Sequence, residues 1–241
     1  PPPALLPGGA ADALLGGGSF TVVDPPLDWG DGVLRPVGPD AFEQIDLALF
    51  DAPGGRHWGW LTQGRVYDQT RRRALPDRSG AALMVSGARA LLVLEARSDG
   101  WLKIRFGQPD DRSGGVAWTR ENLASGRRAS YLPWDQVLAN AQGLVFRNSD
   151  AAHNLREGPG TDAAVIERLE GANFDMAVLE IRGDWMRVRV SEPPACAGSV
   201  ARDLLLGGGG ARVRTGWIAW RSASRGPWVM DVAGPRCGGG V

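Results

Sequence analysis

Residues 178–190, which read VLEIRGDWMRVRV, give the clearest indication of local structure in the chain. An apolar run leads into a polar turn at Gly183 and Asp184, and Trp185 then opens a segment in which arginine and apolar residues alternate. Alternation with a period of two is typical of a half-buried β-strand. The stretch therefore predicts a β-hairpin whose returning strand directs its arginines outward and its apolar side chains inward.

The same hairpin occurs earlier in the chain. Residues 93–106 read VLEARSDGWLKIRF, which repeats the pattern with one more residue in the turn. Two further blocks match in the same order. Residues 49–54 match 155–160, a strand end entering a Pro-Gly turn, and 115–118 match 217–220, each block following a glycine. Three matched blocks in one order indicate a tandem duplication.

The spacing between the blocks shows where the copies differ. The first copy carries about 22 more residues before its hairpin, including Arg71, Arg72 and Arg73. The second carries about 18 more before its last strand, including Cys196 and the four-glycine run 207–210. Both excesses are predicted to be insertions in loops.

The segments outside the matched blocks complete the organisation. Residues 1–40 are rich in proline and glycine and begin almost without charge, which predicts an extended arm. Residues 132–143 predict one short helix, with Pro133 in its first turn and Gly143 as its C-cap. The chain is thus divided into an arm (1–40), a first repeat (41–122), a linker with the helix (123–151), a second repeat (152–224) and a C-terminal tail (225–241).

The composition agrees with a folded, loop-rich β-protein. The 241 residues include 35 glycines and 17 prolines, close to the level of a disordered chain, but 43% are hydrophobic and ten are tryptophan. The 27 basic and 27 acidic residues cancel, which disfavours nucleic acid and anionic membranes as partners. No apolar run is long enough to predict a transmembrane segment.

The repeated blocks resemble the bacterial SH3-like (SH3b) family. The second copy carries the resemblance most closely, in NLREGPG at 154–160, GDWMRV at 183–188 and GWI at 216–218. The first copy is more divergent, because it lacks the arginine after Leu49 and has Gly115 where the second has Trp217. The resemblance implies an all-β chain of two tandem small SH3-like barrels, joined by the short helix and preceded by the extended arm. Members of this family are commonly exported and bind cell-wall or protein ligands, often as appendages of wall hydrolases, so a periplasmic or extracellular location is expected.

Cys196 and Cys237 have two interpretations. They lack the spacing of a metal site, and His57 and His153 each stand alone, so no metal is expected. Two buried thiols or one disulfide both remain open from the residues themselves. The resemblance to an exported family implies that the two cysteines form a disulfide.

The residues do not predict an enzyme. None of the usual nucleophile or zinc-protease motifs occurs, and His57, between Trp58 and Trp60, is predicted to pack on indole rather than to act in catalysis. No cofactor is expected. The function predicted is therefore non-catalytic.

Tryptophan and arginine supply the candidate binding residues. Trp58, Trp60 and Trp228 fall in insertions or tails, and the alternation leaves the face of Trp217 ambiguous. Arg71, Arg72 and Arg73 form a positive spot that is either a solvated loop or a contact for a partner. We expect an interaction or structural protein that docks on a protein partner or a membrane complex. The alternatives are a peptidoglycan-binding module and a regulatory partner of a wall hydrolase.

Overall fold

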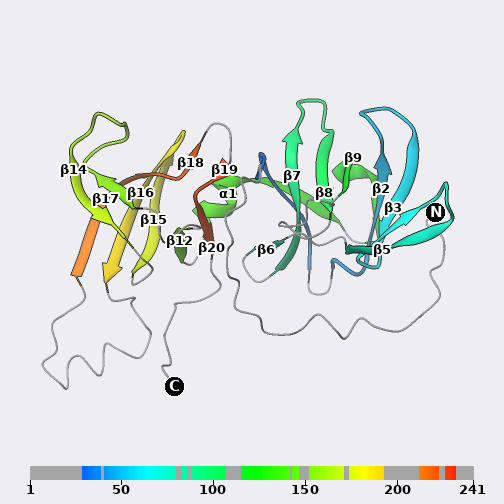
Figure 1. The fold of residues 1–241 in the computed structure, drawn as a ribbon, viewed down its shortest axis with the longest axis horizontal. Coiled ribbons are helices and arrows are strands. Elements are labelled where there is room, and N and C mark those ends of the chain that lie inside the picture. Colours follow the sequence, from blue (N-terminus) through cyan, green and yellow to red (C-terminus); the bar gives the residue numbers. More distant parts are fainter. Residues whose placement is uncertain are drawn as a thin grey trace, which may run out of the picture.

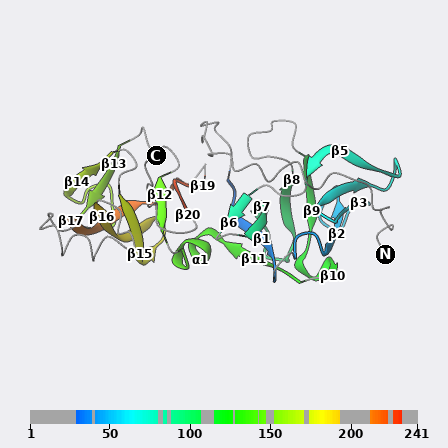
Figure 2. The same ribbon diagram turned by 90° about the horizontal axis from the view of Figure 1, so that it is seen from below.

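The computed structural model describes most of the chain outside its two ends. The described residues are 29–38, 41–79, 83–85, 88–106, 115–126, 128–141, 143–146, 152–170, 174–192, 212–222 and 226–231. They form two antiparallel sheets, a small pair of strands and one α-helix, α1 (Trp134–Ala139). The prediction of an all-β chain is therefore confirmed. Figure 1 shows the two sheets side by side along the long axis, and both views place α1 between them (Figure 2).

The first sheet contains eleven strands in the order β11-β1-β7-β8-β9-β2-β3-β4-β5, with β10 on β2 and β6 on β7. Its strands are β1 (Gly32–Pro36), β2 (Ile45–Phe50), β3 (His57–Thr62), β4 (Arg65–Asp68), β5 (Arg73–Ser79), β6 (Leu83–Val85), β7 (Ala88–Ala96), β8 (Leu102–Phe106), β9 (Gly115–Thr119), β10 (Ala124–Gly126) and β11 (Ala129–Pro133).

The second sheet contains seven strands in the order β14-β13-β17-β16-β15-β12-β20. They are β12 (Leu144–Phe146), β13 (His153–Arg156), β14 (Val165–Leu169), β15 (Asp175–Arg182), β16 (Trp185–Glu192), β17 (Arg212–Ala219) and β20 (Val229–Asp231). A separate pair, β18 (Arg221–Ser222) and β19 (Gly226–Pro227), lies beside them.

One strand order is repeated in both sheets. The path β3-β2-β9-β8-β7-β1-β11 corresponds strand by strand, in chain order and in antiparallel pairing, to β14-β13-β17-β16-β15-β12-β20. Strands β4, β5 and β6 lie in the excess loop of the first copy. Because a seven-strand path is unlikely to recur by accident within one chain, the duplication seen in the sequence is also present in the topology.

Two β-bulges recur at matching positions. Opposite β8 and β16, the extra residues are Leu94 and Leu179, each the leucine of the Val-Leu-Glu motif. Opposite β2 and β13, the extra residues are Trp58 and Ile166. A bulge leaves its extra residue outside the ladder and redirects its side chain, so the copies share local irregularities as well as a strand order.

The register corrects the third sequence match. Lys103 lies opposite Trp118, and Arg187, its counterpart in the second hairpin, lies opposite Trp217. Phe50 and Arg156, which follow the matched Leu49 and Leu155, lie opposite the same two tryptophans. Trp118 therefore corresponds to Trp217, and the match of 115–118 with 217–220 is out of register by three residues.

The sheets extend beyond the ranges assigned to the repeats. Strand β1 lies in the range assigned to the arm, β11 and β12 lie in the range assigned to the linker, and β20 lies in the tail. The linking helix is shorter than 132–143, because Pro133 still belongs to β11 and serves as the N-cap. It ends at Ala139, and its C-cap is Asn140 rather than the predicted Gly143; the Asn140 side chain donates to the Gln136 carbonyl at 2.8 Å.

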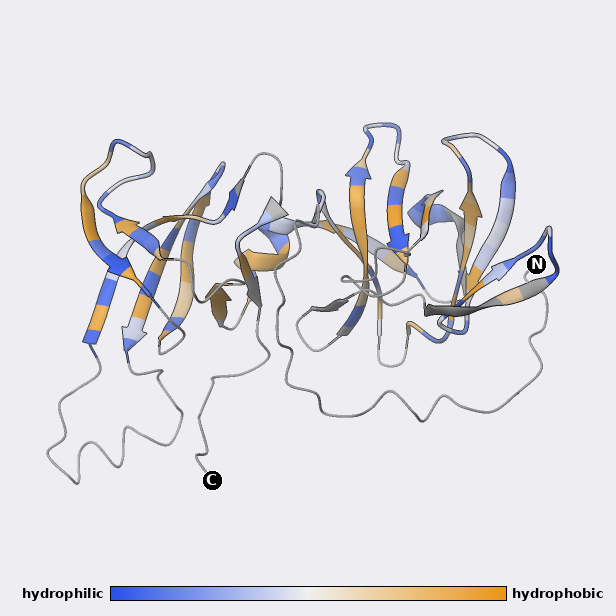
Figure 3. Cartoon of the chain, in the orientation of Figure 1, coloured by the Kyte–Doolittle hydropathy of each residue, from blue (hydrophilic) through white to orange (hydrophobic). Residues whose placement is uncertain are grey.

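The alternation predicted for the second hairpin is confirmed. Met186, Val188 and Val190 are buried, while Arg187 and Arg189 are exposed. The same alternation of apolar and polar residues is visible along β8 (Figure 3). In both hairpins, therefore, one face of the returning strand supplies the core and the other faces outward.

Two clusters of buried side chains form the core. One lies within the first sheet and includes Leu47, Leu49 and Ile104. The other contains Trp29 and Leu92 from the first unit, Trp134, Val137 and Leu138 of α1, and the inward residues of the second sheet. The second core is therefore shared between the two units, with α1 as the element that joins them.

Candidate functional site

Six ring-bearing residues gather on one face of the first sheet. Strand pairing places Trp60 opposite Tyr67, and Phe50 opposite both His57 and Trp118. Directly opposite residues in antiparallel strands share a face, and the core residues Leu47 and Leu49 occupy the other face of β2. We call this surface the aromatic face, and its members are Phe50, His57, Trp60, Tyr67, Trp101 and Trp118.

The rings support one another by edge contacts. Ring centroids are 4.9 Å apart for Trp60 and His57, and 5.3 Å apart for both His57–Phe50 and Phe50–Trp101. Edge-to-face packing at such distances is favourable for aromatic pairs. The prediction that His57 packs on indole is thus confirmed. Trp101 is buried and the other five are half-buried, so the face is fixed in shape yet still presents ring surface.

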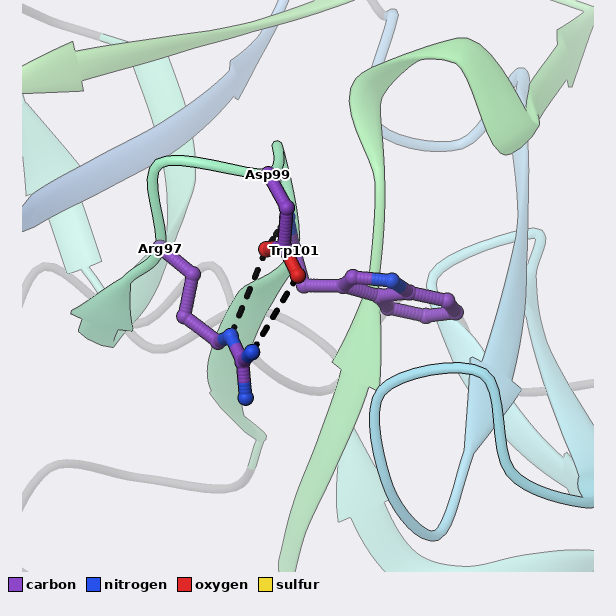
Figure 4. A network of polar contacts seen from close by, with 3 residues as sticks. All are labelled: Arg97, Asp99 and Trp101. Carbon is purple, nitrogen blue, oxygen red and sulfur yellow. Dashed lines mark hydrogen bonds and ion pairs between the residues drawn. The ribbon is translucent and has the colours of Figure 1, made fainter.

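A hairpin turn holds Trp101 in place. Arg97 pairs with Asp99 at 3.2 Å, and the Asp99 carboxylate accepts the backbone N–H of Trp101 at 3.4 Å. Figure 4 shows the indole extending away from this pair, and it is from there that the ring reaches Phe50. Gly100, at φ +85°, supplies the left-handed residue of this three-residue turn.

Cationic side chains border the aromatic face. The Arg120 guanidinium lies 4.6 Å from the centre of the Trp101 ring, and the Lys103 ammonium lies 5.8 Å from that of Trp118. Both distances are in the range of cation–π attraction. Arg105 lies on the same face of β8 as Lys103, two residues further on. The surface therefore combines aromatic rings with positive charge.

The predicted arginine spot lies at the turn between β4 and β5. Arg71 is exposed and pairs with Asp68 at 3.6 Å, and the Asp68 side chain also accepts the N–H groups of Thr70 and Arg71. Arg72 is exposed at φ +51°, and Arg73 begins β5. Because Gln69 donates to the Trp58 carbonyl at 3.0 Å, the turn lies beside β3, at the margin of the aromatic face.

The predicted tryptophans do not form one site. Trp60 belongs to the aromatic face, but Trp58 is the bulged residue and packs towards the core, 6.2 Å from Phe106. Trp217 is only 6% exposed, with the Arg182 guanidinium 5.2 Å from its ring centre. Trp228 lies between β19 and β20 and is half-buried, and its backbone N–H donates to the Trp220 carbonyl at 2.6 Å.

Five members of the aromatic face were not among the predicted binding residues. These are Phe50, His57, Tyr67, Trp101 and Trp118. Their convergence depends on which residues lie opposite one another, and strand register cannot be read from one strand alone. The sequence contained one indication of this face. Trp101, Lys103 and Arg105 alternate with Leu102 and Ile104 in the first hairpin, which places Trp101 on the face opposite these two core residues.

The second repeat uses the same positions differently. Arg156 stands at the position of Phe50, Val165 at that of His57 and Arg168 at that of Trp60. Only two members of the aromatic face have an aromatic counterpart in the second repeat: Trp101 corresponds to Trp185, and Trp118 corresponds to Trp217. The aromatic face is therefore a property of the first repeat, on a framework that both repeats share.

A cleft of about 650 Å³ lies between the two units. Residues from the first unit and α1 form one wall, and β15 with Trp220 and Arg221 forms the other; the lining includes Asp31, Tyr131, Asp135, Leu179 and Glu180. Burial, followed by the nearby carboxylates of Asp31 and Asp135, raises the pKa of Tyr131 from 10.0 to about 12. The cleft is thus a partly apolar space with several carboxylates on its walls.

Other kinds of site receive no support in the described part of the chain. Its residues include no group of three or more metal-ligating side chains placed to hold an ion. None of its helices is long and apolar enough to cross a bilayer. Cys196 and Cys237 lie outside the described residues, so their pairing stays a prediction.

Comparison with known proteins adds no assignment. No protein-family model, no curated protein and no solved structure matches the chain. The case for a function therefore rests on the surfaces described above.

Proposed function

We propose that the chain is a non-catalytic docking protein made of two SH3-like repeats, and that its aromatic face binds a protein partner. The observation that carries this proposal is the array of six rings, five of them half-buried, that is bordered by Lys103 and Arg120. The shared strand order and the repeated hairpins support the SH3-like description of both repeats.

The residue types on this face are those that carry affinity in protein interfaces. Tryptophan, tyrosine and arginine are enriched among residues whose truncation costs the most binding energy. Their rings are already held by neighbours at 4.9–5.3 Å. A surface that is ordered before binding loses less side-chain entropy when a partner arrives, so the edge-packed rings favour docking.

The divergence between the repeats also supports a role for this face. The equivalent positions of the second repeat carry Arg156, Val165 and Arg168 without loss of the strand order. Rings at these positions are therefore not required by the framework. A binding function in the first repeat accounts for them.

Peptidoglycan is the second candidate ligand. Indole rings stack on sugar faces, and the cations at the margin, Lys103, Arg105 and Arg71, are suited to the carboxylates of stem peptides. Both candidate ligands imply a periplasmic or extracellular location, which we propose for the chain. We also propose that Cys196 and Cys237 form a disulfide.

Repeat-swap variants test the proposal. Phe50→Arg and Trp60→Arg copy the residues that the second repeat carries at these positions, so the framework is expected to tolerate them. In capture from a cell-envelope extract, each variant is expected to lose a partner held by the parent chain, with affinity reduced by about tenfold or more. The control is Arg168→Ala, at the position equivalent to Trp60, which should retain the partner.

Purified sacculi distinguish the two ligands. If the parent chain pellets with sacculi and the two swap variants do not, peptidoglycan replaces a protein as the ligand of the aromatic face. If both swap variants bind protein and sacculi as the parent chain does, the aromatic face is not the docking surface.

A further inference from the structure

Among the described residues, no strand pairs with the outer edge of β15 beyond Met176, where this edge borders the cleft. In the described part of the chain, β12 pairs with β15 only at Leu144 and Met176. The four residues Val178 to Ile181 all line the cleft in succession. Consecutive residues of a strand point to opposite faces, so a run that lines one space presents its backbone edge to that space.

The first repeat contains a covered version of the same edge. Its strand β7 corresponds to β15, and β1 continues along it beyond the position of Met176, pairing Gly32 with Val93. The Asp31 N–H donates to the Val93 carbonyl at 2.8 Å, and the Asp31 carboxylate accepts the Ala96 N–H at 2.9 Å. Gly30 passes so close that a side chain there would overlap the Val93 carbonyl.

Comparison with this covered edge shows which backbone groups of β15 face the cleft in the second repeat. Ala96 corresponds to Ile181, because both precede the turn arginine and both lie opposite the residue that follows the hairpin tryptophan, Leu102 or Met186. The Ile181 N–H is therefore directed outward, into the cleft, as that of Ala96 is directed towards Asp31. The bulged leucines differ accordingly: Leu94 packs against the shared core, whereas Leu179 is 49% exposed.

The walls of the cleft indicate the charge of an occupant. Asp31, Asp135 and Glu180 line it, and Glu180 is also paired with Arg182. The one lining cation in the described part, Arg221, is paired with Asp184 at 2.5 Å. Val178, Leu179 and Ile181 supply an apolar floor. An extended segment with alternating basic and apolar side chains matches both features.

We infer that the open edge of β15 is a strand-addition site, at which an extended basic segment of a partner protein pairs antiparallel with residues 178–182. The added backbone accepts the Ile181 N–H, its apolar side chains cover Leu179, and its lysines or arginines face Asp135 and Glu180. Main-chain pairing gives affinity and the alternate side chains give specificity. This site is separate from the aromatic face and does not depend on its function.

The charge of the arm makes it a poor occupant. Residues 1–28 contain Asp12, Asp24 and Asp28 but no lysine or arginine. An acidic segment would meet three carboxylates on the walls of the cleft. A partner with basic residues is therefore the occupant to which we commit.

Amide hydrogen exchange of the full chain tests the inference. The probes are two peptides of about eight residues, one alternating lysine with valine and one alternating glutamate with valine, each long enough to span the edge at about 3.3 Å per residue. The lysine peptide should slow exchange at the Ile181 amide, whose N–H is directed into the cleft, and the glutamate peptide should not. Fluorescence anisotropy of the labelled peptides gives the affinities.

Charge reversal at matched positions provides the control. Glu180→Lys should weaken binding of the lysine peptide by about tenfold or more. Glu95→Lys changes the equivalent residue of the first repeat, where β1 already covers the edge, and should leave binding unchanged. Thermal unfolding of both variants checks that they remain folded.

Five results would overturn the inference. Four of them are the absence of slowed exchange at the Ile181 amide with the lysine peptide, equal binding of the two peptides, equal binding to Glu180→Lys and the parent chain, and faster exchange at this amide after removal of residues 1–28, which would make the arm the occupant. Slowing that depends on protein concentration alone would instead make a second copy of the chain the occupant, and would also overturn it.

Discussion

Tyr131 is the residue whose ionisation the fold changes most clearly. Its hydroxyl donates to the Asp31 carbonyl at 3.2 Å, and burial, followed by the charges of Asp31 and Asp135, raises its pKa from 10.0 to about 12. A raised pKa means that folding favours the protonated phenol. The resulting stabilisation is complete below pH 10 and is lost as the pH rises towards 12.

Titration of the phenolate absorbance checks this behaviour. The chain has two tyrosines, Tyr67 and Tyr131. We expect Tyr131→Phe to remove a component titrating near pH 12 and to make the free energy of unfolding fall less steeply between pH 10 and 12 than in the parent chain. Tyr67→Phe is the control and should retain the late component. Loss of that component in Tyr67→Phe instead would contradict the assignment.

The residue patterns predicted which side chains are buried better than they predicted which residues lie opposite one another in neighbouring strands. The alternation at 186–190 placed each side chain on the correct face, because burial follows from parity within one strand. The match of Trp118 with Trp220 was wrong because an Ala-Trp pair occurs at both places, while the hydrogen-bond register aligns Trp118 with Trp217. The aromatic face was missed for the same reason, since it is assembled across four strands.

Among the elements, the turn of the second hairpin depends on one glycine. Gly183 has φ +56°, and nothing lies within 4 Å of where its Cβ would be. The cost of Gly183→Ala is therefore conformational and should be about 1 kcal/mol of unfolding free energy. Denaturant unfolding measures it. Gly158→Ala, where φ is not positive and the nearest contact is an ordinary 3.7 Å, should differ from the parent chain by much less; equal costs would contradict the backbone explanation.

A buried arginine connects three strands of the second sheet. The Arg214 side chain is 9% exposed and pairs with Glu167 of β14 at 2.6 Å and with Glu192 of β16 at 2.9 Å. Arg214→Met would leave the partly buried Glu167 carboxylate and the exposed Glu192 carboxylate without this partner and should destabilise the chain by about 2 kcal/mol.

Arg212→Met is the matched control for this network. Arg212 also pairs with Glu167, at 3.4 Å, but its side chain is 67% exposed. Exposed pairs contribute about 0–1 kcal/mol, so its loss should be small in denaturant unfolding. An effect of Arg212→Met as large as that of Arg214→Met would refute the role given to burial.

The elements that could be predicted were those with strong local signals. Both hairpins and the helix at Pro133 have turn or capping residues beside periodic segments. Strands β12 and β20 have three residues each, too few to show a period. They exist because β12 pairs with β15 and β20 pairs with β12. Such strands are set by tertiary contacts rather than by their own sequence.

At the scale of the whole molecule, the two repeats share a core. Leu138 of α1 is fully buried in the cluster that contains Trp29 of the first unit and Ile218 of the second. The sequence predicted two repeats and a linking helix, but it contained no sign that the helix packs into a common core. That packing depends on how the sheets meet, and no local pattern encodes it.

The shared core predicts joint unfolding. The chain should show one calorimetric transition, and Leu138→Ala should lower its midpoint as a whole, with a loss of about 2–5 kcal/mol. Leu61→Ala, in the core of the first sheet alone, should shift the same single transition. Two separate transitions in the parent chain, or a shift of only one of them, would contradict a common core.

Site-specific photo-crosslinking in cells that make the chain tests the docking proposal most directly. A photoreactive residue at Trp60 places the probe on the aromatic face, and one at Arg168 places it at the equivalent position of the second repeat. We predict a protein adduct of one defined mass from position 60 and none from position 168. Adducts from position 168 alone, or from neither position, would contradict the assignment of the docking surface.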